Sequence, residues 1–203
     1  MTQLTTRSGS PVRPFSFGTM QFGGKADDVA SQAMFEACLS AGITHFDTAH
    51  IYNGGQSEEI LGRLIHGRDD LYVATKVGYV GSCNKADMMA QFDTCRSRLQ
   101  RDSVDLLYLH HYDPTADMRQ IVDMLATCQA QGLTRHIGLS NLAAWQVMKA
   151  QTIAAEFGTR IDVLQPMYNV VKRQAEVELL PMCADQGIAA CTYSPLGLSL
   201  IHI

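Results

Sequence analysis

The stretch Ile43–Gly62, with the sequence ITHFDTAHIYNGGQSEEILG, indicates how this chain folds. It opens with four residues of strand character, Ile43–Phe46, and the strand stops at a carboxylate, Asp47. A short polar loop that carries Tyr52 follows. A strand that ends in an acid, with a tyrosine five residues later, presents a carboxylate and a phenol at one strand end.

The second half of the same stretch predicts a helix. Ser57 has the character of a helix N-cap. Glu58 and Glu59 then fall in the first turn, where acidic groups favour the helix dipole. The stretch as a whole therefore predicts one βα unit.

This unit recurs along the chain. Glycine stands at three helix-to-strand joints, Gly42, Gly132 and Gly187, each followed by an apolar residue. The predicted strands are Phe15–Phe22, Leu71–Lys76, Val104–His110, Leu133–Ser140, Ile161–Gln165 and Ile188–Tyr193, in addition to the one that ends at Asp47.

The predicted helices carry apolar residues at helical spacing. The expected buried faces are Ala30, Met34, Ala37, Cys38 and Ala41; Met88, Phe92, Cys95 and Leu99; Met118, Ile121, Val122 and Leu125; and Leu142, Trp145, Lys149 and Ile153, with a further helix near Glu176–Asp185. Trp145 and the methionines are interpreted as core residues.

Strict βα alternation leaves a doubly wound sheet or a (β/α)₈ barrel. The strands are continuous apolar runs, which suits parallel strands covered by helices. No GxGxxG follows the first strand, so the Rossmann fingerprint is absent. Polar residues stand where successive strands end, and a barrel brings all its strand ends to one mouth; these residues are Asp47, Lys76, His110, Asn141, Gln165 and Tyr193.

We therefore predict an α/β protein with a (β/α)₈ TIM barrel, of which about seven of the eight βα units are present. The expected domain is a single barrel over residues 15–203 with its C-terminal part missing, after a flexible leader over residues 1–14.

Composition narrows the class of protein. The chain has 203 residues, a formal charge of −4 and 46% apolar residues, which predicts one globular domain with a large core. There is no basic run, so nucleic acid is not an expected partner. The six cysteines form no CxxC pair and are expected to be reduced. Without an apolar signal region or a run of about twenty apolar residues, we expect no membrane partner and a cytoplasmic location.

Four side chains at the predicted barrel mouth suit one kind of chemistry. Tyr52 is a phenol with an ordinary pKa of about 10, and the charge of Lys76 is expected to lower that pKa. Asp47 can pair with Lys76, and His110 can orient a substrate oxygen. Such a group suits a reaction in which an oxygen gains negative charge and then a proton, as in reduction of a carbonyl by hydride.

At the level of motifs, the chain resembles the aldo-keto reductase family from about Phe15 to Leu196. The segments that carry the resemblance are FDTAHIYNGGQSEEILG (46–62), ATK (74–76), VDLLYLHHYDP (104–114), IGLSN (137–141), QPMYN (165–169) and YSPLG (193–197). The resemblance implies a barrel enzyme that reduces an aldehyde or ketone, a small-molecule carbonyl substrate, with NADP(H) as cofactor.

The resemblance also implies roles for single residues. Tyr52 is expected to be the general acid, with Asp47, Lys76 and His110 as its catalytic partners. The implied cofactor-binding residues are Gly18, Thr19, Met20, Asp47, Ser140, Asn141, Gln165, Tyr193, Ser194 and Leu196, with Ser140, Asn141 and Gln165 on the nicotinamide carboxamide and Tyr193 stacked on the ring. No metal is expected.

The segment after Leu196 departs from the family. Residues 197–203 have the sequence GLSLIHI, without the glycine pattern or the basic residues that grip an adenosine 2′-phosphate in the family. We interpret this as a truncation. The carbonyl substrate, the preference for NADP over NAD and the oligomeric state are not specified by this sequence.

Other interpretations compete with the enzyme. Ser140 and Asn141 can be a simple helix cap, and His45 and His136 can be core histidines. The chain can be a cofactor-binding sensor or regulatory subunit with little turnover, or an inactive truncated fragment. His110, His111 and Asp113 can hold a metal in a hydrolase, although no well-spaced third ligand supports that alternative.

Overall fold

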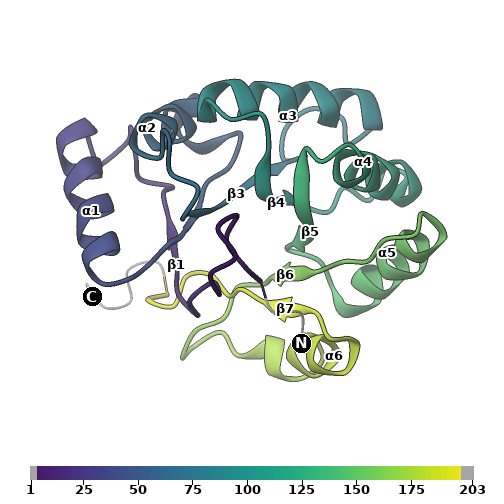
Figure 1. The fold of residues 1–203 in the computed structure, drawn as a ribbon. Helices are drawn as coiled ribbons and strands as arrows, with labels where there is room; N and C mark the ends of the chain where they lie inside the picture. Colours follow the sequence, from purple (N-terminus) through teal and green to yellow (C-terminus); the bar gives the residue numbers. More distant parts are fainter. Residues whose placement is uncertain (1–3, 198–203) are drawn as a thin grey trace.

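The computed structural model describes residues 4–197, in which parallel strands alternate with helices (Figure 1). The strands are β1 Ser16–Gly18, β2 His45–Asp47, β3 Tyr72–Val77, β4 Val104–Leu109, β5 Thr134–Ser140, β6 Val163–Gln165 and β7 Ala189–Ala190. The helices are α1 Asp28–Ser40, α2 Gln56–Leu64, α3 Lys85–Leu99, α4 Met118–Ala130, α5 Ala144–Glu156 and α6 Leu179–Gln186, with short 3₁₀ turns η1 Tyr52–Gly55 and η2 Gln174–Glu176.

The strands form one sheet in the order β1-β2-β3-β4-β5-β6-β7, and every neighbouring pair is parallel. A doubly wound sheet would reverse its order at a switch point. Here the sheet curls in one direction, with the helices around its outside (Figure 1). The predicted fold is confirmed: these are seven strands of a (β/α)₈ barrel. Within residues 4–197, β1 pairs only with β2 and β7 only with β6.

Strand alternation separates the barrel interior from the layer under the helices. Tyr72 and Ala74 of β3 pack with Leu106 and Tyr108 of β4 in a small interior cluster. Their neighbours, such as Val73 of β3, face the helices instead. Lys76 lies two residues beyond Ala74, so its side chain points into the barrel.

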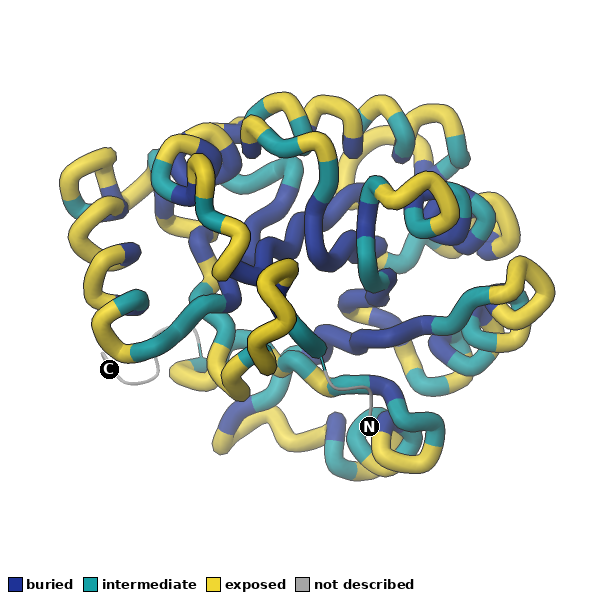
Figure 2. The backbone as a smooth tube through the Cα atoms, in the orientation of Figure 1, coloured by how far each residue is buried: buried dark blue, intermediate teal, exposed yellow. Residues whose placement is uncertain are grey.

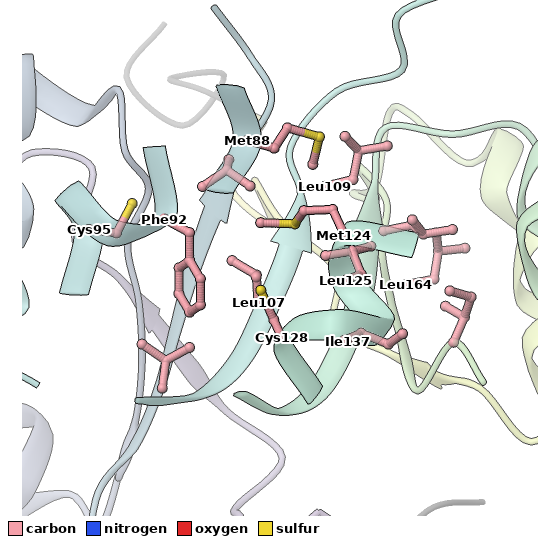
Figure 3. Close-up of a cluster of buried hydrophobic side chains, with 14 of the residues drawn as sticks. Met88, Phe92, Cys95, Leu107, Leu109, Met124, Leu125, Cys128, Ile137 and Leu164 are labelled. Atoms are coloured by element: carbon pink, nitrogen blue, oxygen red, sulfur yellow. The ribbon is translucent and has the colours of Figure 1, made fainter. Parts of the chain in front are cut away.

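The main core lies between the sheet and the helices (Figure 2), where buried strands are covered by helices whose outer faces are exposed. Figure 3 shows Phe92 of α3 beside Leu107 of β4, with Cys95 on the same helix further from that strand. All four predicted core residues of α3 are buried, and so are all four of α4. The predicted buried faces of these two helices are therefore confirmed.

The three glycines at the helix-to-strand joints take the left-handed conformation, with φ of 75° at Gly42, 71° at Gly132 and 65° at Gly187. A residue with a side chain is strained there, which is why glycine follows these helices.

The buried face of α1 agrees with the prediction only at Cys38. The structure buries Ser31, Phe35 and Cys38, whereas Met34 is 39% exposed. Phe35 packs on Phe46 of β2 with ring centroids 4.7 Å apart. The helix carries two apolar stripes, and the larger aromatic side chain, rather than the methionine and alanines, faces the sheet.

The predicted face of α5 is correct only in part: Leu142 is buried just before the helix and Ile153 packs against the core, whereas Lys149 is exposed. Val147, Ala150 and Ala154 are the buried residues of this helix, and Trp145 is 62% exposed. Trp145 lies instead near Tyr112, with ring centroids 6.4 Å apart. Small residues face the sheet here because they let the helix approach closely.

The segment predicted as a flexible leader makes specific contacts from residue 4 onward. Thr5 and Pro11 form an antiparallel bridge, and Leu4 and Val12 pack against the interior cluster of the barrel. Arg135 of β5 donates to the carbonyl oxygen of Thr5 at 2.7 Å. In Figure 1 this dark purple segment crosses the centre of the barrel. Its contacts with Ser103, just before β4, and with Arg135, at the start of β5, place it at the end opposite the strand C-termini. Of the helices within residues 4–197, none combines the length and the apolar character needed to cross a bilayer.

The revised face of α1 is open to test. Phe35→Ala is expected to lower the free energy of unfolding by about 3 kcal/mol or more, since it removes a buried aromatic ring. Met34→Ala is the matched control from the same turn and should cost about 0.5 kcal/mol or less. Denaturant unfolding of both variants measures the difference; equal costs would contradict the observed orientation of α1.

Candidate active site

An ion pair lies at the centre of the barrel mouth. The Nζ atom of Lys76 donates to Oδ1 of Asp47, and both side chains are buried. Lys76 also donates to the carbonyl oxygen of Thr48 at 2.9 Å, while Gln165 donates to the other Asp47 oxygen at 2.9 Å. Each charge therefore has several partners, which a buried ion pair requires.

Tyr52 lies on the turn η1, with its hydroxyl oxygen 3.4 Å from the Lys76 Nζ atom. Burial raises the pKa of Tyr52 above its usual value, while the charge of Lys76 acts in the opposite direction. The sequence-based expectation is thus right that Lys76 lowers the pKa of Tyr52. The net shift is nevertheless upward, because burial raises the pKa more than the lysine lowers it.

Lys76 remains a cation in this setting. Burial alone would lower the pKa of its ammonium group, but Asp47 and Tyr52 raise it, and the balance lies above the usual value. A permanent positive charge therefore stands beside the phenol.

His110 completes the group. Its ring lies edge-on to Tyr52, with centroids 5.7 Å apart, and its Nδ1 atom is buried without a protein partner. Burial and the nearby Lys76 charge lower the imidazole pKa to about 3. His110 is therefore neutral at physiological pH and can donate a hydrogen bond without carrying charge. The next residue, His111, is exposed, as expected for neighbours in an extended segment.

This burial makes stability pH-dependent. The folded-state pKa of about 3 lies below the ordinary value of 6.5, so the unfolded chain binds the extra proton first as pH falls. The contribution of His110 to the free energy of unfolding is fully present above pH 6.5. Below that pH it is lost at up to about 1.4 kcal/mol per pH unit. Urea unfolding at pH 7 and pH 5 measures how much unfolding free energy each protein loses between these pH values. The loss should be smaller for His110→Gln than for wild type. His111→Gln, which removes the exposed neighbour, is the control and should keep the wild-type loss.

Residues that the resemblance implies for the nicotinamide lie together at the ends of β5, β6 and β7. Ser140 Oγ donates to the Gln165 carbonyl oxygen at 3.0 Å. Asn141 donates to the His110 carbonyl oxygen at 3.0 Å and accepts from the Tyr193 hydroxyl at 2.6 Å. Asn141 also has a φ of 62°, unusual for a residue other than glycine. Such strain is found more often at functional sites than elsewhere.

The other implied cofactor residues lie on both sides of the mouth. Gly18 is paired with Asp47, and the Thr19 amide donates to the Asp47 carbonyl oxygen at 2.8 Å. Met20 is partly exposed beyond them. Across the mouth, Ser194 has a φ of 57° and Leu196 is exposed. The structure thus brings the four predicted catalytic residues together and distributes the cofactor-implied residues around them.

Ser57 is not a helix N-cap. Helix α2 begins at Gln56 after Gly55, whose φ of 102° suits glycine. The Ser57 hydroxyl is buried and lies 2.9 Å from each of the hydroxyls of Thr19 and Thr48. This serine therefore ties the turn after β1 to the loop after β2.

Two further side chains lie behind the Tyr52 turn: Arg98, which sequence analysis did not single out, and Glu58, which it predicted only as an acid in the first turn of a helix, where it does lie. Glu58 is fully buried and accepts from the Thr75 hydroxyl at 2.7 Å and from Arg98 at 3.2 Å. Arg98 follows the buried Cys95 by three residues on α3, and that position was a signal that it faces inward.

The competing interpretation, a metal held by His110, His111 and Asp113, is not supported. Among residues 4–197, the His, Cys, Asp and Glu side chains whose ligand atoms lie within 4.8 Å of one another in a group of three are His50, Glu58 and Cys95. That group does not include His110, His111 or Asp113. The guanidinium of Arg98 stands 3.2 Å from Glu58, and its positive charge disfavours a cation at this group.

A hollow of about 550 Å³ opens beside the mouth. Asn141 and Tyr193 line it, together with apolar residues such as Met167 and Leu179. Two cofactor-implied residues therefore line this hollow, and Tyr52 does not.

Comparison with known proteins identifies the class. Residues 14–202 match the model of the Aldo/keto reductase family. The match covers nearly the whole chain, so the protein belongs to the aldo/keto reductase family.

The chain is also similar to named reductases and to a named dehydrogenase. Aflatoxin B1 aldehyde reductase member 2 of Rattus norvegicus is 38% identical over 96% of this chain and 55% of its own length. Norsolorinic acid reductase B of Aspergillus parasiticus is 32% identical over 96% of this chain and 57% of its own length. Aryl-alcohol dehydrogenase [NADP(+)] of Phanerodontia chrysosporium is 29% identical over 96% of this chain and 58% of its own length. The chain thus spans little more than half the length of these relatives.

Proposed function

We propose that this protein is an oxidoreductase that reduces an aldehyde or ketone to an alcohol with NADPH, with Tyr52 as the general acid. The observation that carries the proposal is the buried Asp47–Lys76 pair with the Tyr52 hydroxyl 3.4 Å from the lysine. Family membership and the reductase names of its relatives support the same activity.

Each side chain has a distinct task in this proposal. NADPH, held by the residues named in the next paragraph, would supply a hydride to the carbonyl carbon when bound. As negative charge develops on the carbonyl oxygen, the Tyr52 hydroxyl donates its proton to that oxygen. Lys76 stabilises the phenolate that remains, and Asp47 holds Lys76 in place. His110, neutral at the working pH, donates a hydrogen bond to the same oxygen and orients the carbonyl.

The chemistry of the polar groups at the ends of β5 and β6 fits a nicotinamide. A carboxamide needs both donors and acceptors, and Ser140, Asn141 and Gln165 offer a hydroxyl and two amides within one small area. The ring of Tyr193 lies next to them and can stack on a flat heterocycle. We propose that these residues, with Gly18, Thr19, Met20, Ser194 and Leu196, hold NADP(H).

The substrate class is proposed from the rim of the mouth. Tyr79 lies 4.8 Å from His110 between ring centroids and is half exposed. Trp145, in the first turn of α5, and Tyr112, in the loop after β4, form a second aromatic pair at the same end. Flat aromatic carbonyl compounds suit such surfaces. Relatives named for aflatoxin B1 aldehyde and aryl alcohol agree with that choice.

Steady-state consumption of NADPH with aromatic and short aliphatic aldehydes tests this proposal. Oxidation of NADPH that depends on the aldehyde, with a higher kcat/KM for the aromatic series, is the expected result. Binding of NADPH without its consumption by any carbonyl compound would instead favour the cofactor-binding subunit.

A further inference from the structure

One side chain of α3, that of Arg98, binds the main chain of the turn that carries Tyr52. Arg98 donates to the His50 carbonyl oxygen at 2.9 Å and lies 3.5 Å from the Gly54 carbonyl oxygen. These two carbonyl groups stand two residues before and two residues after Tyr52. One guanidinium therefore spans the base of the turn.

The turn is shaped to admit this guanidinium. A Cβ atom on Gly55 would lie 2.3 Å from the Arg98 Cζ atom, so any side chain there would collide with it. Gly54 and Gly55 both have positive φ, which bends the backbone around the arginine. The pair of glycines thus lets the main chain approach the side chain closely.

The counter-ion of Arg98 connects the same turn to β3. Glu58 of α2 is fully buried, accepts from Arg98 with one oxygen and from the Thr75 hydroxyl with the other. Thr75 directly precedes Lys76. The chain of contacts therefore runs from the Tyr52 turn through Arg98 and Glu58 to the strand that positions Lys76.

We propose that Arg98 is a positioning residue, which holds the Tyr52 hydroxyl against the Lys76 ammonium by fixing both ends of the Tyr52 turn. The inference rests on the proposed role of Tyr52 as proton donor. Arg98 itself lies behind the turn, with its contacts on the main chain and on the side chains of Glu58 and His50. Its planar fork serves several acceptors at once, which a lysine ammonium cannot do in the same geometry.

The inference predicts a particular pattern for Arg98→Met. A misplaced acid slows the chemical step, so kcat for carbonyl reduction should fall by about 100-fold. The KM for the carbonyl substrate should change little, because the side chains that line the mouth remain. Arg98→Lys should recover only part of the kcat. The matched control is Arg96→Met. Arg96 lies on the same helix with similar side-chain exposure, and its side-chain hydrogen bonds are with Asp93 and Asp102 rather than with the turn.

A second measurement does not depend on activity. The amides of His50, Tyr52 and Gly54 donate main-chain hydrogen bonds within and beside the turn. In Arg98→Met their hydrogen exchange should accelerate strongly, while the amides of β3 and β4 keep wild-type rates. In Arg96→Met all of these amides should exchange as in wild type. Faster exchange throughout the sheet would indicate general destabilisation and would overturn the inference.

Loss of the arginine also leaves Glu58 buried without its cation, and Arg98→Met can therefore fold poorly. The double variant Arg98→Met/Glu58→Gln removes that unpaired charge and keeps an oxygen for Thr75. Stability restored with kcat still low supports positioning. Restoration of kcat together with stability would show that Arg98 acts only on folding. If the wild type reduces no carbonyl compound, the proposed function fails, and the exchange rates alone decide whether Arg98 anchors the turn.

Discussion

Tyr52→Phe is expected to lower kcat for carbonyl reduction by about two to four orders of magnitude, the usual contribution of a general acid. The substitution removes only the hydroxyl that lies 3.4 Å from Lys76 and keeps the ring that packs against His110. The cofactor-implied residues on β5 to β7 are untouched, so NADPH affinity should stay close to the wild-type value. Steady-state kinetics and a fluorescence titration of NADPH measure the two quantities.

The control for this prediction is another tyrosine of the same end of the barrel. Tyr168 donates to Glu176 at 2.5 Å, away from the Asp47–Lys76 pair. Tyr168→Phe should therefore retain the wild-type kcat. If Tyr52→Phe keeps most of its kcat while Tyr168→Phe does the same, the proton comes from another group and the assignment of the acid is wrong.

Local sequence patterns predicted most of the scaffold because each depends on one short segment. Continuous apolar runs located the strands, and a glycine after each of three helices marked the return to the sheet. The catalytic group followed from the same logic, since parallel strands in a barrel bring their C-terminal ends together. Asp47, Lys76 and His110 are far apart in sequence, yet each stands at a strand end.

The errors arose where tertiary contacts decide between two local alternatives. Helix α1 has two apolar stripes, and only the position of Phe46 shows that Phe35 takes the inner one. Trp145 was assigned to the core by residue type, but α5 approaches the sheet through alanine and valine. Ser57 suits an N-cap in isolation, and its buried partners, Thr19 and Thr48, directly follow β1 and β2.

Electrostatic balance was also beyond the reach of sequence. The charge of Lys76 favours the phenolate of Tyr52, as the residue types predict. How strongly burial opposes it depends on the packing of the turn, and here burial prevails. Arg98 contacts the carbonyl groups of His50 and Gly54, which lie 44 or more residues before it in the sequence. A short sequence motif cannot predict a contact over that separation.

Lys76→Met is expected to combine a large loss of stability with loss of activity. The substitution leaves the buried Asp47 carboxylate with Gln165 as its remaining side-chain donor and leaves the Thr48 carbonyl oxygen without its lysine donor. An uncompensated buried charge of this kind costs about 3–5 kcal/mol. Without the ammonium, burial acts on Tyr52 unopposed, so its pKa rises further and the alkaline limit of the pH–rate profile moves to higher pH. Denaturant unfolding and the pH dependence of kcat measure the two effects.

Two variants separate charge pairing from catalysis. Lys85→Met breaks the half-exposed contact between Lys85 and Asp123, and such surface pairs contribute about 0–1 kcal/mol, so this control should stay near wild type in stability. Asp47→Asn/Lys76→Met removes both buried charges and should recover much of the stability lost in Lys76→Met. Its kcat should remain low, because the cation that stabilises the phenolate is still missing. A Lys76→Met protein with wild-type stability and an unchanged pH–rate profile would show that the ammonium group neither compensates Asp47 nor acts on Tyr52.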